Sequence, residues 1–195
     1  MKEIAKVGVA GGGLMGSGIA QVSAMAGFDT IVREVTEPLT QKSRASIEKV
    51  LAKGIEKGKV TADERDAAMA KLSFTTDLAK LADCNIIIEA VVEDLGMKNA
   101  MWKELNGICP SDTIFASNTS SLTIAAMAAA CGRPEKMLGL HFFNPVPLMK
   151  LVEVVRTITT SEETADAAFE FAKKLGKEPV RAKDNSGFIV NLLLV

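Results

Sequence analysis

The feature that most constrains this chain is a glycine-rich segment near its N-terminus. An apolar run over residues 4–10 leads directly into Gly11-x-Gly13-x-x-Gly16, and apolar residues at helical spacing follow. The expected order is strand, tight turn, helix. In a dinucleotide site, the first glycine makes the turn, the second lets bare backbone approach a pyrophosphate, and the third lets helix and strand pack closely. The phosphates then lie at the helix N-terminus, where unpaired N–H groups favour an anion.

The segment after this helix favours a dinucleotide site over a purely structural turn, which glycine-rich strand ends also form. A second apolar run, Thr30-Ile31-Val32, ends at Arg33-Glu34. A carboxylate at about this distance from the glycines is typical of the residue that accepts a hydrogen bond from the adenosine ribose. A carboxylate repels a 2′-phosphate, so Glu34 predicts tighter binding of NAD than of NADP, a preference that Arg33 would weaken.

Length, charge and cysteine content narrow the class of protein. A chain of 195 residues can bury a complete core, and its 23 basic and 24 acidic residues give no sign of a nucleic-acid or membrane surface. Cys84, Cys109 and Cys131 are far apart and form no metal-binding pattern, which predicts reduced thiols in the core and no zinc site. The sequence has no apolar leader and no stretch long enough to span a membrane, so we expect a cytoplasmic protein.

Apolar runs alternate with amphipathic segments, which predicts an α/β fold with a doubly wound, mostly parallel sheet. Strands are expected near residues 84–92, 113–116, 137–141, 150–156 and 179–181, and helices near residues 97–108, from 122 onward and 162–175. Ligands of such sheets bind at the carboxyl ends of the strands. Residues 90–93, 117–121 and 141–144 are expected at those ends.

A helical arm is predicted at about residues 38–72, as a long amphipathic helix to about residue 58 and a short one after it. Lys49, Lys53 and Lys57 are spaced four residues apart, which places three ammonium groups on one side of the long helix. An acidic ligand would relieve their repulsion. The plainer alternative is a solvated polar face.

His141 is the only histidine, and there is no tyrosine, so few side chains could move a proton near neutral pH. A lone histidine is more often structural than catalytic. Glu153, however, interrupts the apolar run of residues 151–155, and a buried carboxylate is costly unless it is paired. The proline-containing turn at residues 144–147 could fold this strand back beside His141. A carboxylate partner would fix the imidazole tautomer, as a general base for an alcohol requires.

Four segments together resemble the L-3-hydroxyacyl-CoA dehydrogenase family, including its short-chain 3-hydroxybutyryl-CoA members. They are Gly11-x-Gly13-x-Met15-Gly16-x-Gly18-Ile19-Ala20, Glu89-Ala90-Val91-Val92-Glu93, Ala116-Ser117-Asn118-Thr119-Ser120-Ser121 and His141-Phe142-Phe143-Asn144-Pro145-Val146-Pro147. The resemblance covers essentially the whole chain. It implies a Rossmann-type NAD-binding domain over residues 1–184 and an oxidoreductase that interconverts (S)-3-hydroxyacyl-CoA and 3-oxoacyl-CoA in fatty-acid or butanoate metabolism.

The resemblance also implies roles for individual residues. The implied catalytic residues are His141 as the base, Glu153 as its orienting partner, Ser120 as a hydroxyl near the substrate and nicotinamide, and Asn191 as an active-site amide. The implied cofactor-binding residues are Gly11, Gly13, Leu14, Met15, Gly16, Glu34, Ala90, Glu93, Lys98, Ser120 and Asn144, and the implied coenzyme A contacts are Lys53, Lys57 and Ser120. The plainer alternative for Ser120 is a helix cap.

The sequence departs from the family pattern in two ways. Members continue as a helical domain that dimerises and closes the cleft, so residues 185–195 are expected to be only its start, and the homodimer of the full-length enzyme is expected to form through the part that is absent. A leucine follows Asn191 where the family typically has an arginine. We therefore expect this chain to bind NAD with little turnover.

Two alternative functions stay open. One is a sugar-acid dehydrogenase of the same superfamily, and the other is a non-catalytic dinucleotide-binding or structural protein like some crystallins. The lysines of the arm favour coenzyme A over the first alternative. The joint presence of His141, Glu153, Ser120 and Asn191 argues against the second.

Overall fold

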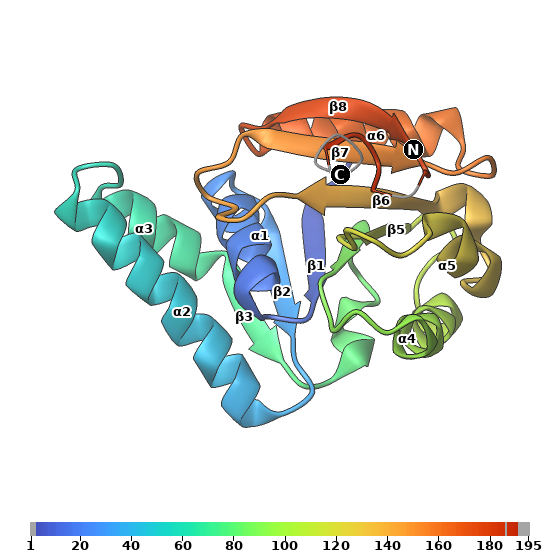
Figure 1. Ribbon diagram of the computed structural model, residues 1–195. Coiled ribbons are helices and arrows are strands. Elements are labelled where there is room, and N and C mark those ends of the chain that lie inside the picture. The colour runs from blue at the N-terminus through green and yellow to red at the C-terminus, as the bar shows by residue number, and fades with distance from the viewer. Residues whose placement is uncertain (1–2, 186, 191–195) are drawn as a thin grey trace.

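The computed structural model describes residues 3–185 and 187–190. Within these residues the strands form one eight-stranded sheet in the order β3-β2-β1-β4-β5-β6-β7-β8 (Figure 1). The strands are β1 Lys6–Ala10, β2 Asp29–Arg33, β3 Leu72–Thr75, β4 Ile86–Glu89, β5 Ile114–Ser117, β6 Met137–Phe142, β7 Leu151–Arg156 and β8 Glu178–Lys183. Only β6 and β7 pair antiparallel. The predicted doubly wound, mostly parallel sheet is confirmed.

Helices cover both faces of this sheet. They are α1 Leu14–Met25, α2 Glu37–Glu56, α3 Ala62–Ala70, α4 Leu95–Ile108, α5 Ile124–Ala130 and α6 Glu162–Lys174, with short 3-10 helices η1 Leu78–Leu81 and η2 Pro134–Lys136. Ile86 and Ile88 of β4 belong to one apolar cluster with Ile19 of α1. Ile87, between them, belongs to a second cluster with Trp102 of α4. The strand is apolar throughout because both of its faces are covered.

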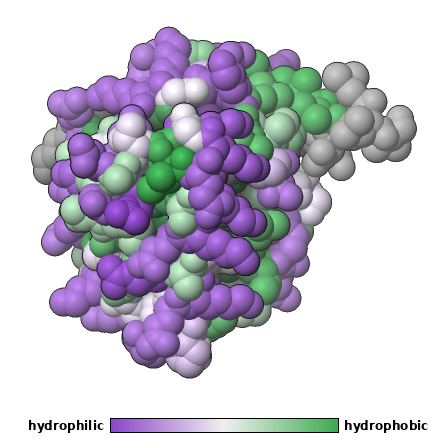
Figure 2. Space-filling model, turned by 90° about the vertical axis from the view of Figure 1, so that its left-hand side faces the viewer, coloured by the Kyte–Doolittle hydropathy of each residue, from purple (hydrophilic) through white to green (hydrophobic). Residues whose placement is uncertain are grey.

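The helical arm consists of α2 and α3, which lie together at one side of the sheet (Figure 1). Ile47 and Leu51 of α2 are buried, whereas Lys53 and Lys57 are exposed. Figure 2 shows that the surface on that side of the molecule is mostly hydrophilic and that a small apolar patch lies within it. The arm therefore presents its lysines at the surface, as the spacing predicted.

The three cysteines are buried and free, as predicted. Burial raises the pKa of the Cys84 thiol to about 12 and that of Cys109 to about 11. Because the thiolate is the reactive form, both side chains are inert parts of the core. In the described ranges, no helix has the length and apolar character needed to cross a membrane.

Helix α5 begins at Ile124, two residues later than predicted. The carboxylate of Asp184 accepts hydrogen bonds from the main-chain N–H groups of Ile124 at 3.0 Å and Ala125 at 2.7 Å. These groups are among those that a helix start leaves without partners. Asp184 is remote in sequence, so the local pattern carried no sign of it.

Candidate active site

The three glycines of the turn after β1 have different surroundings. Gly11 has a φ of 94°, and a Cβ there would lie 2.7 Å from the carbonyl oxygen of Ala90. A Cβ on Gly16 would lie 1.7 Å from the carbonyl oxygen of Gly11, whereas one on Gly13 would meet nothing within 4 Å. The first glycine therefore makes the turn, the third lets α1 pack closely, and Gly13 leaves bare backbone open to a pyrophosphate.

The N-terminus of α1 faces this open backbone. Gly13 is the N-cap residue and has no side chain with which to cap the helix. The first-turn N–H groups can therefore bind an anion. Leu14 is exposed and Met15 half-buried beside the turn. The turn fits the pyrophosphate of a dinucleotide.

Glu34 lies beside the same turn, at the end of β2. Its Oε1 accepts a hydrogen bond from the main-chain N–H of Gly12 at 2.6 Å, and its Oε2 accepts from Val35 at 3.2 Å. Its side chain is half-buried. The carboxylate is thus fixed next to the glycines, where a ribose hydroxyl could reach it. The tighter binding of NAD than of NADP stays a prediction.

His141 and Glu153 face each other across the antiparallel pair of β6 and β7. The imidazole Nδ1 lies 2.7 Å from Glu153 Oε2. His141 is 5% exposed and Glu153 is fully buried. The predicted return of the second strand beside the histidine is confirmed.

The other oxygen of Glu153 is held by main-chain groups that the sequence did not reveal. Oε1 accepts hydrogen bonds from the N–H groups of Ile189 and Val190, both at 2.9 Å. Because a carboxylate only accepts, Nδ1 of His141 carries a hydrogen, and in the neutral form of this imidazole the lone pair lies on Nε2. Glu153 thus orients the imidazole from its Nδ1 side, and the rings of Phe143 and Phe188 pack beside it.

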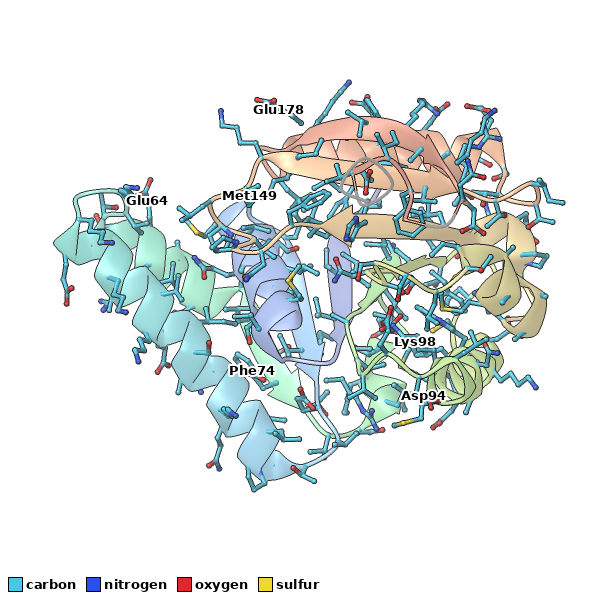
Figure 3. All side chains as sticks on the ribbon, in the orientation of Figure 1. Glu64, Phe74, Asp94, Lys98, Met149 and Glu178 are labelled. Carbon is cyan, nitrogen blue, oxygen red and sulfur yellow. The ribbon has the colours of Figure 1, made fainter. Side chains whose placement is uncertain are left out.

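A second buried carboxylate, Glu89, was not assigned a role from the sequence. It lies at the end of β4 and is fully buried, and Lys98 of α4 is 1% exposed. The Lys98 Nζ lies 2.7 Å from Glu89 Oε1 and 2.9 Å from Glu93 Oε2, where α4 faces the loops after β4 and β5 (Figure 3). The hydroxyl of Ser117 donates to Glu89 Oε2 at 2.6 Å. Glu89 could have been identified from the sequence because it is a carboxylate at the end of an otherwise apolar strand.

Glu93 joins the loops that follow β4 and β5. The hydroxyls of Thr119 and Ser121 both donate to its Oε1. Burial alone would raise the pKa of Glu93, but the hydrogen bonds from Thr119 and Lys98 outweigh it and hold this pKa below its ordinary value. Ser120 lies between the two hydroxyl donors and is exposed. The N-cap of α5 is Thr123, so Ser120 does not cap that helix.

The loop that carries Ser120 is also joined to the end of β6. The side-chain oxygen of Asn118 accepts a hydrogen bond from the main-chain N–H of Phe142 at 2.9 Å. Phe142 directly follows His141, and the exposed Asn144 comes two residues later. The strand ends thus bring Ser120 and His141 onto neighbouring segments. Asn191 lies outside the described residues.

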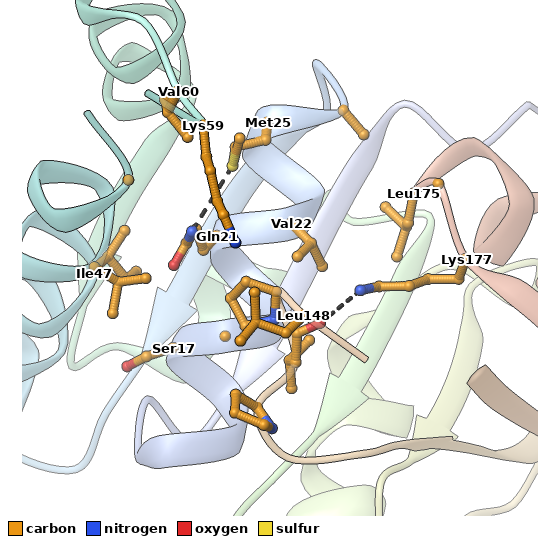
Figure 4. Close-up of a pocket in the computed structure, with 18 of the residues that line it drawn as sticks. Ser17, Gln21, Val22, Met25, Ile47, Lys59, Val60, Leu148, Leu175 and Lys177 are labelled. Atoms are coloured by element: carbon orange, nitrogen blue, oxygen red, sulfur yellow. Dashed lines mark hydrogen bonds between the residues drawn. The ribbon is translucent and has the colours of Figure 1, made fainter. Parts of the chain in front are cut away.

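A groove of about 730 Å³ separates the arm from the turn between β6 and β7 (Figure 4). The apolar part of its wall includes Val22, Ile47 and Leu148. Its lysines come from the arm, the turn and the end of α6, and they are Lys53, Lys57, Lys59, Lys150, Lys174 and Lys177. No aspartate or glutamate is among the described residues that line it. The groove therefore suits a long ligand with an anionic part.

Comparisons with known proteins show the family to which this chain belongs. Residues 6–185 match the family model for the NAD-binding domain of 3-hydroxyacyl-CoA dehydrogenase. A 3-hydroxybutyryl-CoA dehydrogenase of Mycobacterium tuberculosis is 51% identical over 98% of this chain and 68% of that protein. The mitochondrial hydroxyacyl-coenzyme A dehydrogenase of Sus scrofa is 46% identical over 97% of this chain and 62% of that protein.

A solved structure shows the same fold. The crystal structure of FadB2 from M. tuberculosis superposes with a TM-score of 0.97 and 50% identity, covering 99% of this chain and 68% of that one. Both the sequence and the fold are thus shared over nearly the whole of this chain. The chain belongs to the 3-hydroxyacyl-CoA dehydrogenase family, and residues 6–185 form its NAD-binding domain.

Proposed function

We propose that this chain serves the NAD-dependent interconversion of (S)-3-hydroxyacyl-CoA and 3-oxoacyl-CoA. The observation that carries the proposal is the buried pair of His141 and Glu153, whose Nδ1 and Oε2 atoms lie 2.7 Å apart. This pair leaves Nε2 of a lone histidine as a base at the carboxyl end of β6. A substrate hydroxyl hydrogen-bonded to Nε2 would lose its proton there.

The residues around the glycine turn would hold the cofactor. The turn and the N-terminus of α1 would bind the pyrophosphate, and Glu34 would accept from the adenosine ribose. Glu93 and Asn144 would contact the nicotinamide half. Lys98 would act through Glu93, because its ammonium is buried between two carboxylates. When bound, NAD supplies the acceptor for the hydride that leaves C3 of the substrate.

Glu153 would orient the base. Its Oε2 keeps Nδ1 of His141 as the donor, and its Oε1 is held by two main-chain N–H groups. The imidazole therefore cannot turn away without breaking a buried hydrogen bond. Ser120 and Asn191 would position the substrate oxygens beside this base.

The groove would hold the coenzyme A part of the substrate. Lys53 and Lys57 line it on the arm, and Asn144 lines it from the turn that follows His141. One cavity thus extends from the lysines to the segment beside the base. Phosphates are bound well by lysine ammonium groups, which act as point charges. This arrangement favours an acyl-CoA over a sugar acid, which has no phosphate for the arm to bind.

We also propose that the cofactor-binding domain ends at about residue 184 and that a helical domain starts at residue 185. Strand β8 ends at Lys183, and the match to the family model ends at residue 185. In a longer form of the protein, that domain would close the cleft and form a homodimer.

The test compares binding with turnover in one preparation. NAD affinity is measured by calorimetry, and oxidation of 3-hydroxybutyryl-CoA is followed through NADH formation, with a panel of sugar acids as the control substrates. We expect NAD binding, weak oxidation of the thioester by this chain, and stronger oxidation when a family helical domain is added. Oxidation of a sugar acid in preference to the thioester would contradict the proposal, as would NAD binding with no oxidation in either form.

A further inference from the structure

Lys177 is a buried lysine to which the proposed mechanism gives no role. It lies in the connection between α6 and β8 and is 8% exposed. Its Nζ donates to the main-chain carbonyl oxygens of Val146 at 2.5 Å and Met149 at 2.9 Å. Figure 4 draws one of these two bonds. Both carbonyls belong to the turn between β6 and β7. The side chain thus ties one end of α6 to that turn.

The charge of Lys177 is buried, and no acidic side chain of the described residues pairs with it. No ion pair within residues 3–185 and 187–190 includes it, and burial lowers the pKa of its ammonium. Burying a charge costs free energy unless hydrogen bonds replace those to water. A methionine of similar length would avoid this cost. The lysine is therefore explained by the two carbonyls that it holds.

Helix α1 holds the same turn from another side. Val146 is 2% exposed, and a Cβ on Gly18 would lie 2.8 Å from the Val146 Cβ. The turn therefore packs directly on the backbone of α1. Within it, the N–H groups of Leu148 and Met149 both donate to the carbonyl oxygen of Pro145 at 3.0 Å. Lys177 and Gly18 together fix a compact segment in one position.

This segment forms one wall of the groove and carries Asn144. We propose that Lys177 is a positioning residue for the acyl-CoA substrate, because it fixes the groove wall at residues 144–149. This inference rests on the proposed function of the groove. His141 is held separately, by the pairing of β6 with β7 and by Glu153. Lys177 thus affects how tightly the substrate binds in the groove and does not change the position of the base, His141.

The test compares Lys177→Met with Lys173→Met. Lys173 carries the same charge and lies in the last turn of α6, outside the groove; its side chain is 51% exposed and pairs with Glu170. In Lys177→Met, the amides of Leu148 and Met149 should exchange hydrogen about tenfold faster, and the Kd for 3-hydroxybutyryl-CoA should rise about tenfold, as expected for two lost hydrogen bonds. Amides between β1 and β4 should not change. Lys173→Met should leave both measurements within about twofold of the unsubstituted chain.

Steady-state kinetics separate positioning from a general loss of structure. In a form of the protein that turns over, Lys177→Met should raise KM for the thioester and leave kcat within about threefold. A merely structural role would reduce the folded fraction, which lowers kcat and leaves KM unchanged. That result, or unchanged exchange at Leu148 and Met149, would overturn the inference.

Two further measurements cover the remaining outcomes. If Lys177→Met does not fold, the unsubstituted chain labelled with ¹⁵N-lysine is used, and two slowly exchanging ammonium signals are expected, one from Lys98 and one from Lys177. The signal of Lys98 is assigned with Lys98→Met, and the absence of a second slow signal would overturn the inference. If the unsubstituted chain binds NAD but not 3-hydroxybutyryl-CoA, the proposed function of the groove fails, while the exchange data still decide whether Lys177 holds the turn.

Discussion

Glu89 and Glu153 are two fully buried carboxylates whose partners give them different uses. Each lies in an otherwise apolar strand and accepts hydrogen bonds from the main chain. Glu89 also accepts from the side chains of Lys98 and Ser117, and Glu153 from that of His141. Glu89 meets the ammonium of Lys98, which is itself buried between two carboxylates. Glu153 meets an imidazole, which has a second nitrogen on its far side.

The difference follows from the partners' chemistry. A lysine ammonium has donors only, so once it is held between Glu89 and Glu93 it has no acceptor to offer a substrate. A neutral imidazole is a donor at one nitrogen and an acceptor at the other. Glu89 therefore serves to position the loops around Glu93 and Ser120, whereas Glu153 serves to present a base.

The largest expected effect comes from His141→Gln, which removes the base. Turnover should fall by about 10³-fold or more, because general base catalysis commonly contributes about 10²–10⁴-fold. NAD affinity should change little, since the glycine turn and Glu34 do not contact this pair. Steady-state kinetics and calorimetry on a catalytically active form provide the two measurements. Near-normal turnover would show that another group takes the proton.

Lys98→Met should break the other pair and affect stability first. It leaves Glu89 buried without its cation, and breaking a buried ion pair in this way costs about 3–5 kcal/mol. The free energy of unfolding is measured with denaturant. The control is the double variant Glu89→Gln with Lys98→Met, which should be more stable than Lys98→Met because Glu93, the carboxylate that still lacks its cation, is partly exposed to water. A double variant that is less stable than Lys98→Met would contradict the role given to this pair.

Much of the fold, and the pairing of Glu153 with His141, could be predicted from the sequence because local patterns determine them. The glycine spacing predicted the turn, and the apolar runs predicted the sheet. Glu153 stood out because a carboxylate inside an apolar strand needs a partner, and the nearby turn indicated where that partner lies.

What the sequence could not reveal depends on contacts between distant segments. The N–H groups of Ile189 and Val190 reach Glu153 only because the chain after β8 returns to β7. Asp184 sets the start of α5 in the same way. Lys177 resembled any surface lysine of a helix end, since nothing local shows that its ammonium enters the core. The buried ion pair at Glu89 required knowing that α4 packs over the end of β4.

Glu153→Gln should have a smaller effect than loss of the base itself. The glutamine side chain has nearly the shape of the glutamate it replaces. Its neutral oxygen accepts a weaker hydrogen bond from Nδ1, however, and its NH₂ group donates where the carboxylate accepted. Turnover should fall by about 10–10²-fold, with KM changed less than kcat. Glu153→Asp is the matched variant that keeps the charge and shortens the reach. Equal turnover in Glu153→Gln and the unsubstituted protein would show that His141 is oriented by packing against Phe143 and Phe188 alone.

The smallest expected effect concerns Glu93, the partly exposed carboxylate that also pairs with Lys98. Its pKa is lower in the folded chain than the ordinary value of 4.5, so its ionised form stabilises the fold above that value. This contribution is lost as the pH falls below 4.5 through the lower pKa of the folded state. Thr119→Val removes the strongest hydrogen bond that lowers this pKa, so acid unfolding should begin at a slightly higher pH. Thr76→Val, at an exposed threonine after β3, is the control and should leave the acid transition unchanged. A transition that moves to lower pH in Thr119→Val would mean that burial, and not hydrogen bonding, dominates at Glu93.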